Sequence, residues 1–123
     1  MAKPVLVVVD GEGGSLQALT AELESRYGAN YQVTSGSSAE VALARLAELK
    51  AAGADVPLVL ADEWLPGMSG TQLLARVRDF FPTARRSLLI YWRDRSKAAP
   101  FLEAAARGWV GGFLPGQAGV VTG

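Results

Sequence analysis

The chain has 123 residues, half of them hydrophobic, which is enough to bury one core but too few for two ordinary domains. Its 12 basic and 12 acidic residues leave no net charge, which argues against binding to nucleic acid or to an anionic membrane surface. It contains neither cysteine nor histidine, so disulfides, thiol catalysis and the commonest general base are excluded. The first apolar run is too short for a signal peptide or a membrane span, and we expect a soluble, cytoplasmic protein.

The N-terminal third predicts a strand, a helix and a second strand. Residues 5–9 are apolar and mostly β-branched, as in a central parallel strand that is covered on both faces, and the run stops at Asp10. The glycine-rich segment 11–14 predicts a loop, after which Ser15 caps a helix that ends at Gly28. A short strand is predicted over 31–34.

The middle of the chain predicts a helix and then a buried strand that ends on an acid. The segment 37–40 has the spacing of a capping box, and the alanine- and leucine-rich helix that it opens runs to about Lys50. The apolar run 56–62 ends at Asp62, and a proline and a glycine follow shortly after it. This pattern predicts that the strand places the Asp62 carboxylate at the rim of a sheet.

The C-terminal half continues the alternation. The predicted elements are a helix over 71–81, a strand over 87–91, a short helix over 99–107 and a strand over 109–114. We interpret residues 1–116 as one domain and the glycine-rich residues 117–123 as a tail or the start of a linker. Because a fifth covering helix is short or missing, we expect the side of strands four and five to be buried by a homodimer, by a domain-swapped oligomer or by the rest of a longer protein.

Strands that alternate with helices at this spacing predict an α/β fold with a doubly wound, five-stranded parallel sheet. In the flavodoxin-like strand order 2-1-3-4-5, ligands bind at the carboxyl ends of strands one and three. Asp10 and Asp62 end those two strands. The order therefore predicts that two carboxylates meet in one crevice, with Glu12 within reach.

These residues resemble the receiver domains of bacterial two-component response regulators, the CheY-like family, over about residues 4–116. The resemblance rests on Asp10 and on Asp62 followed by the turn Leu65-Pro66-Gly67-Met68-Ser69-Gly70. It implies that Asp62 is the phosphoacceptor and that Asp10, Glu12 and Asp62 hold Mg²⁺. It also implies a phosphorelay role with a sensor kinase or an output domain as the partner, and no independent enzyme activity.

Other positions depart from the family pattern. Ile90 stands where a Thr or Ser hydroxyl is expected, and Leu114 stands in the place of a lysine, since Lys97 is the last lysine of the chain. Phe113 lies near the aromatic switch position, but without the hydroxyl at position 90 we expect no switching. Tyr91 and Trp92 follow strand four, where two large rings either cover the site or fill the space of the missing lysine.

Three hypotheses follow for the function. The preferred one is an atypical receiver, with weak or absent phosphorylation, that acts through protein–protein interaction. The second is a competent, Mg²⁺-dependent phosphoacceptor that uses Asp62. The third is a regulatory receiver of a larger flavoenzyme, because Arg26-Tyr27-Gly28 and Phe81-Pro82 resemble receivers that precede thioredoxin-reductase-like flavoenzymes.

Overall fold

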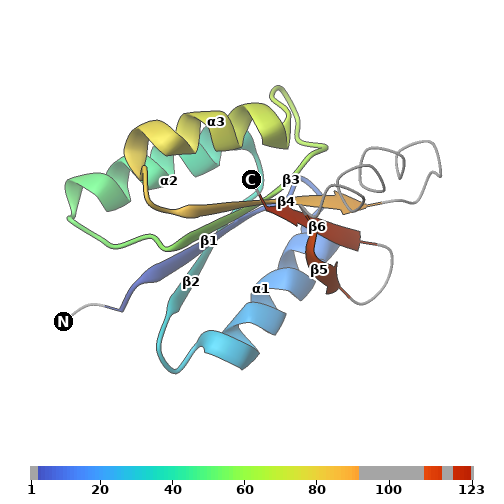
Figure 1. Cartoon of the computed structure of the whole chain (residues 1–123), viewed down its shortest axis with the longest axis horizontal. Helices are drawn as coiled ribbons and strands as arrows, with labels where there is room; N and C mark the ends of the chain where they lie inside the picture. The colour runs from blue at the N-terminus through green and yellow to red at the C-terminus, as the bar shows by residue number, and fades with distance from the viewer. Residues whose placement is uncertain (1–2, 92–109, 115–117, 123) are drawn as a thin grey trace.

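The computed structural model describes residues 3–91, 110–114 and 118–122. The described elements form a six-stranded sheet in the order β2-β1-β3-β4-β6-β5, together with three helices (Figure 1). The elements are, in chain order, β1 (Val5–Val9), α1 (Gly13–Tyr27), β2 (Gln32–Gly36), α2 (Ala39–Ala51), β3 (Leu58–Asp62), α3 (Gly70–Phe80), β4 (Arg85–Tyr91), β5 (Val110–Leu114) and β6 (Ala118–Thr122).

The first four strands confirm the predicted α/β architecture. Strands β2, β1, β3 and β4 are adjacent in that order and parallel, as the flavodoxin-like arrangement requires. Helices α2 and α3 cover one face of this sheet and α1 covers the other (Figure 1). The chain therefore places the carboxyl ends of β1 and β3 side by side.

The core lies mainly between the sheet and helices α2 and α3. All five residues of β1 are buried, as expected for a strand covered on both faces. Leu46 of α2 and Leu73 and Val77 of α3 are fully buried against this sheet face. Burial of a side chain of this size stabilises the fold by about 1.5–3 kcal/mol. This packing holds the strand ends in fixed positions.

The starts of α1 and α2 differ in detail from the sequence prediction. Helix α1 begins at Gly13, inside the predicted loop, because Glu12 is its N-cap residue and the Glu12 carbonyl accepts from the Leu16 N–H. Helix α2 is capped by Ser38, whose hydroxyl accepts from the Val41 N–H at 3.2 Å. The cap therefore lies one residue later than predicted, and Val41 at the third helical position cannot complete the predicted 37–40 capping box.

The far edge of the sheet also differs from the prediction. The segment 118–122, expected to be a tail, forms β6, which pairs antiparallel with β4. Strand β5 forms as predicted but lies outside β6 and pairs antiparallel with it, so it does not follow β4 in the order. Only residues 115–117 separate the two strands, and a parallel pair would need a crossover of about a dozen residues or more.

The predicted helix over 99–107 lies outside the described residues. In the part of the chain that the structure describes, no helix is long and apolar enough to span a membrane.

Candidate functional site

The register of the sheet brings Asp10 and Asp62 to the same level. Val9 of β1 pairs with Ala61 of β3, and the two acids are the next residue of each strand. Neighbouring parallel strands lie about 4.8 Å apart, and side chains at the same level point to the same face. The predicted meeting of the two carboxylates at the carboxyl ends of β1 and β3 therefore occurs in the structure.

Each carboxylate is held by a backbone amide of its own loop. The Glu12 N–H donates to Oδ1 of Asp10 at 2.9 Å, and the Trp64 N–H donates to Oδ1 of Asp62 at 3.1 Å. In both cases the donor lies two residues after the acid, which is the geometry of an Asx turn. The same local device thus fixes both acids of the pair.

The pair is buried and electrostatically strained. Asp10 is completely buried and Asp62 is 4% exposed. Burial raises the pKa of Asp62 from 3.8 to about 7, the nearby Asp10 carboxyl and the Glu63 charge add to the rise, and the Trp64 N–H opposes it. A side-chain hydrogen bond between Asp62 and Asp10 contributes to the same shift. Near neutral pH about half of the Asp62 carboxyl groups are therefore protonated.

Glu12 does not join the two buried acids as a third carboxylate. It is exposed, and its backbone N–H is the group that contacts Asp10. Among the residues that the structure describes, no group of three or more His, Cys, Asp or Glu side chains is placed to hold a metal ion. Two neighbouring carboxylates nevertheless fit Mg²⁺, which takes oxygen ligands and keeps several waters. The structure thus supports a two-carboxylate donor set.

The loops after β1 and β3 contact each other beside the acids. A Cβ added to Gly11 would lie 3.0 Å from Pro66 Cδ, so the first loop has little room for a side chain there. Gly67 follows that proline with φ +77, a left-handed conformation that favours glycine and is typical of the third position of a type II turn. The proline and glycine of the predicted motif thus shape the rim of the site.

Gly70 packs the start of α3 onto the phosphoacceptor candidate. A Cβ at this position would overlap the Asp62 carbonyl oxygen and lie 2.8 Å from Leu88 Cδ1. Only a residue without a side chain allows helix and strand to approach so closely. The last glycine of the motif is therefore explained by close packing at Asp62.

The N-terminus of α3 uses contacts that the sequence analysis missed. The Ser69 hydroxyl accepts from the Gln72 N–H, and the Gln72 side chain accepts from the Ser69 N–H, which is a capping box. The Glu63 carboxylate accepts from both the N–H and the hydroxyl of Thr71, at 3.1 and 2.6 Å. The Ser-x-x-Gln spacing was a visible signal for the box, whereas the Glu63 contact depends on the folded loop.

The positions that depart from the family pattern lie on β4 and on β5. Ile90 of β4 is one residue beyond Leu89, which pairs with Asp62, and it pairs with Gly119 of β6. The strand beside β4 is β6. The prediction that β5, which carries Phe113 and Leu114, lies next to β4 is therefore wrong.

The side chains of the two aromatic residues that were predicted at the mouth of the site lie outside the part of the structure that is described. Tyr91 is the last residue of β4, and Trp92 lies outside the described residues. Their effect on the site stays a prediction.

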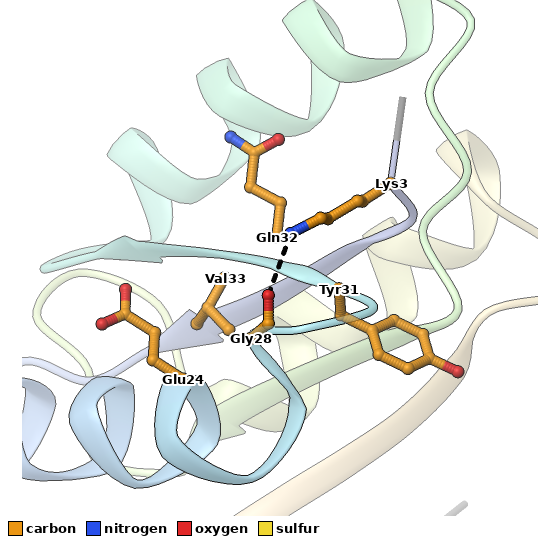
Figure 2. Close-up of a pocket in the computed structure, with 6 residues that line it drawn as sticks. All are labelled: Lys3, Glu24, Gly28, Tyr31, Gln32 and Val33. Atoms are coloured by element: carbon orange, nitrogen blue, oxygen red, sulfur yellow. Dashed lines mark hydrogen bonds between the residues drawn. The ribbon is translucent and has the colours of Figure 1, made fainter. Parts of the chain in front are cut away.

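A shallow pocket of about 540 Å³ lies elsewhere, near the start of β1 and β2 (Figure 2). Within it, the Lys3 ammonium donates to the Gly28 carbonyl at 3.0 Å. The residues that line it are Lys3, Glu24, Gly28, Tyr31, Gln32 and Val33. It lies at the amino ends of the strands and does not include the acid pair.

No protein-family model and no curated protein matches the chain, but solved structures do. The signal receiver domain of an HD domain-containing protein from Pseudomonas fluorescens Pf-5 is 30% identical, with a TM-score of 0.57, and the match covers 78% of this chain and 73% of that chain. The receiver domain of the hybrid histidine kinase CckA is 26% identical, with a TM-score of 0.54, over 67% of this chain and 70% of that one. The chain belongs to the response-regulator receiver (CheY-like) family.

A further neighbour supports the same fold. The response regulator receiver domain protein from Clostridium thermocellum is 22% identical, with a TM-score of 0.63, and the match covers 81% of this chain and 75% of that chain. The protein is thus a receiver-like domain of two-component signalling. Receivers typically bind Mg²⁺ at the phosphorylation site, and the Asp10–Asp62 pair lies where strands β1 and β3 end.

Proposed function

We propose that this receiver is atypical: Asp62 accepts a phosphoryl group weakly or not at all, and the domain acts through protein–protein contacts in one constant conformation. The observation that carries the proposal is the buried Asp10–Asp62 pair, with Ile90 just beyond the level of Asp62. The acids of a receiver site are present, while the groups that respond to a phosphoryl group are replaced.

The chemistry of the acid pair explains the weak reaction. An aspartate attacks a phosphoryl donor only as the ionised carboxylate, and it forms a covalent acyl phosphate. Because the pKa of Asp62 is raised to about 7, a large part of the population is protonated at neutral pH. Asp10 and Asp62 would hold Mg²⁺, which supplies positive charge against the oxygens of the phosphoryl group.

The missing groups explain the lack of a switch. Isoleucine at position 90 has no hydroxyl to contact a phosphoryl oxygen, and the sequence has no lysine after Lys97. A unit charge pair at close contact is worth about 4 kcal/mol at an effective dielectric constant of about 20, so a receiver without the lysine loses an interaction of that order. A local change at Asp62 then lacks the hydroxyl and the lysine through which the family pattern couples it to strands four and five.

The test is incubation with acetyl phosphate and Mg²⁺, followed by intact mass spectrometry. We expect less than about a tenth of the chain to gain the mass of one phosphoryl group, and Asp62→Asn to remove this adduct. Asp55→Asn, which changes an exposed acid, is the control and should leave it unchanged. Nearly complete phosphorylation of the wild type would show a competent phosphoacceptor, and an adduct that persists in Asp62→Asn would exclude Asp62.

The partners of this module are a sensor kinase or an output domain and a second copy of the chain. Self-association is supported by the edge of the sheet in the described part of the chain: β5 is the last strand there, and its sequence, VGGFL, contains no charge and no proline, the residues that usually protect such edges. We expect a dimer or larger species by light scattering at micromolar concentration. A monodisperse monomer would contradict this part of the proposal.

A further inference from the structure

We propose that Glu63 is a positioning residue for Asp62 and that it acts through Thr71 of helix α3. The proposal rests on the proposed function only in taking Asp62 as the reacting carboxylate. It concerns the loop of residues 64–69, which joins β3 to α3 and carries the amide that holds the Asp62 side chain.

All the hydrogen-bonding groups of Glu63 are used at the base of this loop. Its N–H donates to the Leu89 carbonyl of β4 at 3.1 Å, and its carbonyl accepts from the Gly70 N–H at 3.0 Å. Its carboxylate accepts from the Thr71 N–H and hydroxyl at 3.1 and 2.6 Å. One residue therefore ties the end of β3 to β4 and to the first turn of α3.

The contact with Thr71 is stronger than an ordinary surface hydrogen bond. It is bidentate, the acceptor is charged, and it lies at the positive end of the α3 dipole. Because Glu63 and Gly70 close the two ends of the loop, the loop backbone has little freedom. We name the Glu63–Thr71 contact the clasp.

The clasp determines where the Trp64 amide points. Trp64 directly follows Glu63, so the Glu63 contacts fix the backbone from which the Trp64 N–H donates to Oδ1 of Asp62 at 3.1 Å. The orientation of the amide then depends on the fixed position of Glu63. This amide thereby fixes the orientation of the Asp62 carboxylate, which is the reacting group of the proposed function.

The two acids provide an internal control. The Glu12 N–H makes the equivalent bond to Asp10 at 2.9 Å from the loop after β1, whereas Glu63 and Thr71 belong to the segment after β3. Removal of the clasp should release the Trp64 amide and leave the Glu12 amide held. A general loss of stability would release both.

The experiment is amide hydrogen exchange by NMR on the full chain, without Mg²⁺ or a phosphoryl donor. In Glu63→Ala we expect the Trp64 amide to exchange about tenfold faster, and in Thr71→Val about threefold faster, as for the loss of charge-assisted hydrogen bonds. Glu63→Gln and Thr71→Ser keep donor and acceptor groups in place and should stay within about twofold of the wild type. The Glu12 amide should be unchanged in all four variants.

A double-mutant cycle completes the test. Glu63→Ala with Thr71→Val should exchange no faster than Glu63→Ala alone, because both variants remove the same contact. Equal acceleration of the Trp64 and Glu12 amides, or no change at Trp64, would overturn the proposal. If Glu63→Ala does not fold, the comparison of Thr71→Val with Thr71→Ser decides it. Because no phosphoryl donor is present, the result is independent of whether Asp62 is ever phosphorylated.

Discussion

Replacement of Asp62 by asparagine should make this protein more stable at alkaline pH. Asp62 is buried beside Asp10, and burial raises its pKa from 3.8 to about 7. The folded chain therefore keeps a proton between about pH 4 and pH 7 that the unfolded chain releases. The free energy of unfolding falls as the pH rises through this range, and it stays reduced above it.

The size of the effect follows from the same values. A tenfold change in proton affinity is worth about 1.36 kcal/mol, so the rise to about 7 costs about 3–4 kcal/mol of stability at pH 8. At pH 4 the cost is less than about 1 kcal/mol, because the carboxyl is then protonated in most folded and about half of unfolded chains. Asparagine has no charge, and it keeps an oxygen that accepts from the Trp64 N–H.

The assay is urea unfolding followed by far-UV circular dichroism at pH 4, 6 and 8 in the presence of EDTA. We expect Asp62→Asn to exceed the wild type by about 3–4 kcal/mol at pH 8 and by less than about 1 kcal/mol at pH 4. Asp55→Asn, at an exposed acid, should stay within about 0.5 kcal/mol throughout. A gain that is the same at pH 4 and pH 8, or a loss of stability at pH 8, would refute the reasoning.

Three further predictions concern packing and the metal. Gly70→Ala should lower the free energy of unfolding by about 3 kcal/mol or more, because the added Cβ overlaps the Asp62 carbonyl. Gly14→Ala, which adds a Cβ in open space on α1, should raise it by about 0.5–1 kcal/mol. Equal effects of the two variants in urea unfolding would contradict the close approach of α3 to Asp62. Leu46→Ala should cost about 3 kcal/mol, while the exposed Val41→Ala should cost less than about 0.5 kcal/mol, also by urea unfolding. Millimolar Mg²⁺ should raise the melting temperature of the wild type but not of Asp62→Asn, and an equal rise in both would place the metal elsewhere.

The acid pair could be predicted because it depends on local patterns and on simple topology. The apolar runs before Asp10 and Asp62 mark two strands, and the βαβ connections make those strands parallel. Their carboxyl ends must then lie at one edge. The positions of these two residues thus follow from the sequence without knowledge of any side-chain contact.

The contacts around the pair could not be predicted in the same way. Glu63 is an ordinary loop acid in the sequence, and its bond to Thr71 exists only after the loop has closed. Glu12 lies near Asp10 in sequence, but the turn presents its amide to that acid, and the helix begins directly after it. Such contacts depend on small rotations of the loop backbone, and the periodicity of the sequence does not predict these rotations.

The prediction for the far edge of the sheet was wrong for a different reason. Residues 118–122 begin with an alanine and a glycine before Val120 and Val121, so the sequence of this segment alone predicts a tail. Its β-branched residues become a strand because β4 and β5 both offer it a partner. Strand formation at residues 118–122 depends on pairing with neighbouring strands, which the local strand propensity does not predict.

The most direct test of the central claim is a comparison of amide NMR spectra with and without beryllium fluoride, a phosphoryl mimic, in the presence of Mg²⁺. We expect shifts at Asp10, at Asp62 with the contacting Leu89, and at the two loops that follow the acids, and no shifts along residues 85–88 of β4. Shifts that extend along β4 would reveal a working switch, and a spectrum unchanged at Asp10 and Asp62 would show that the buried acids form no such site.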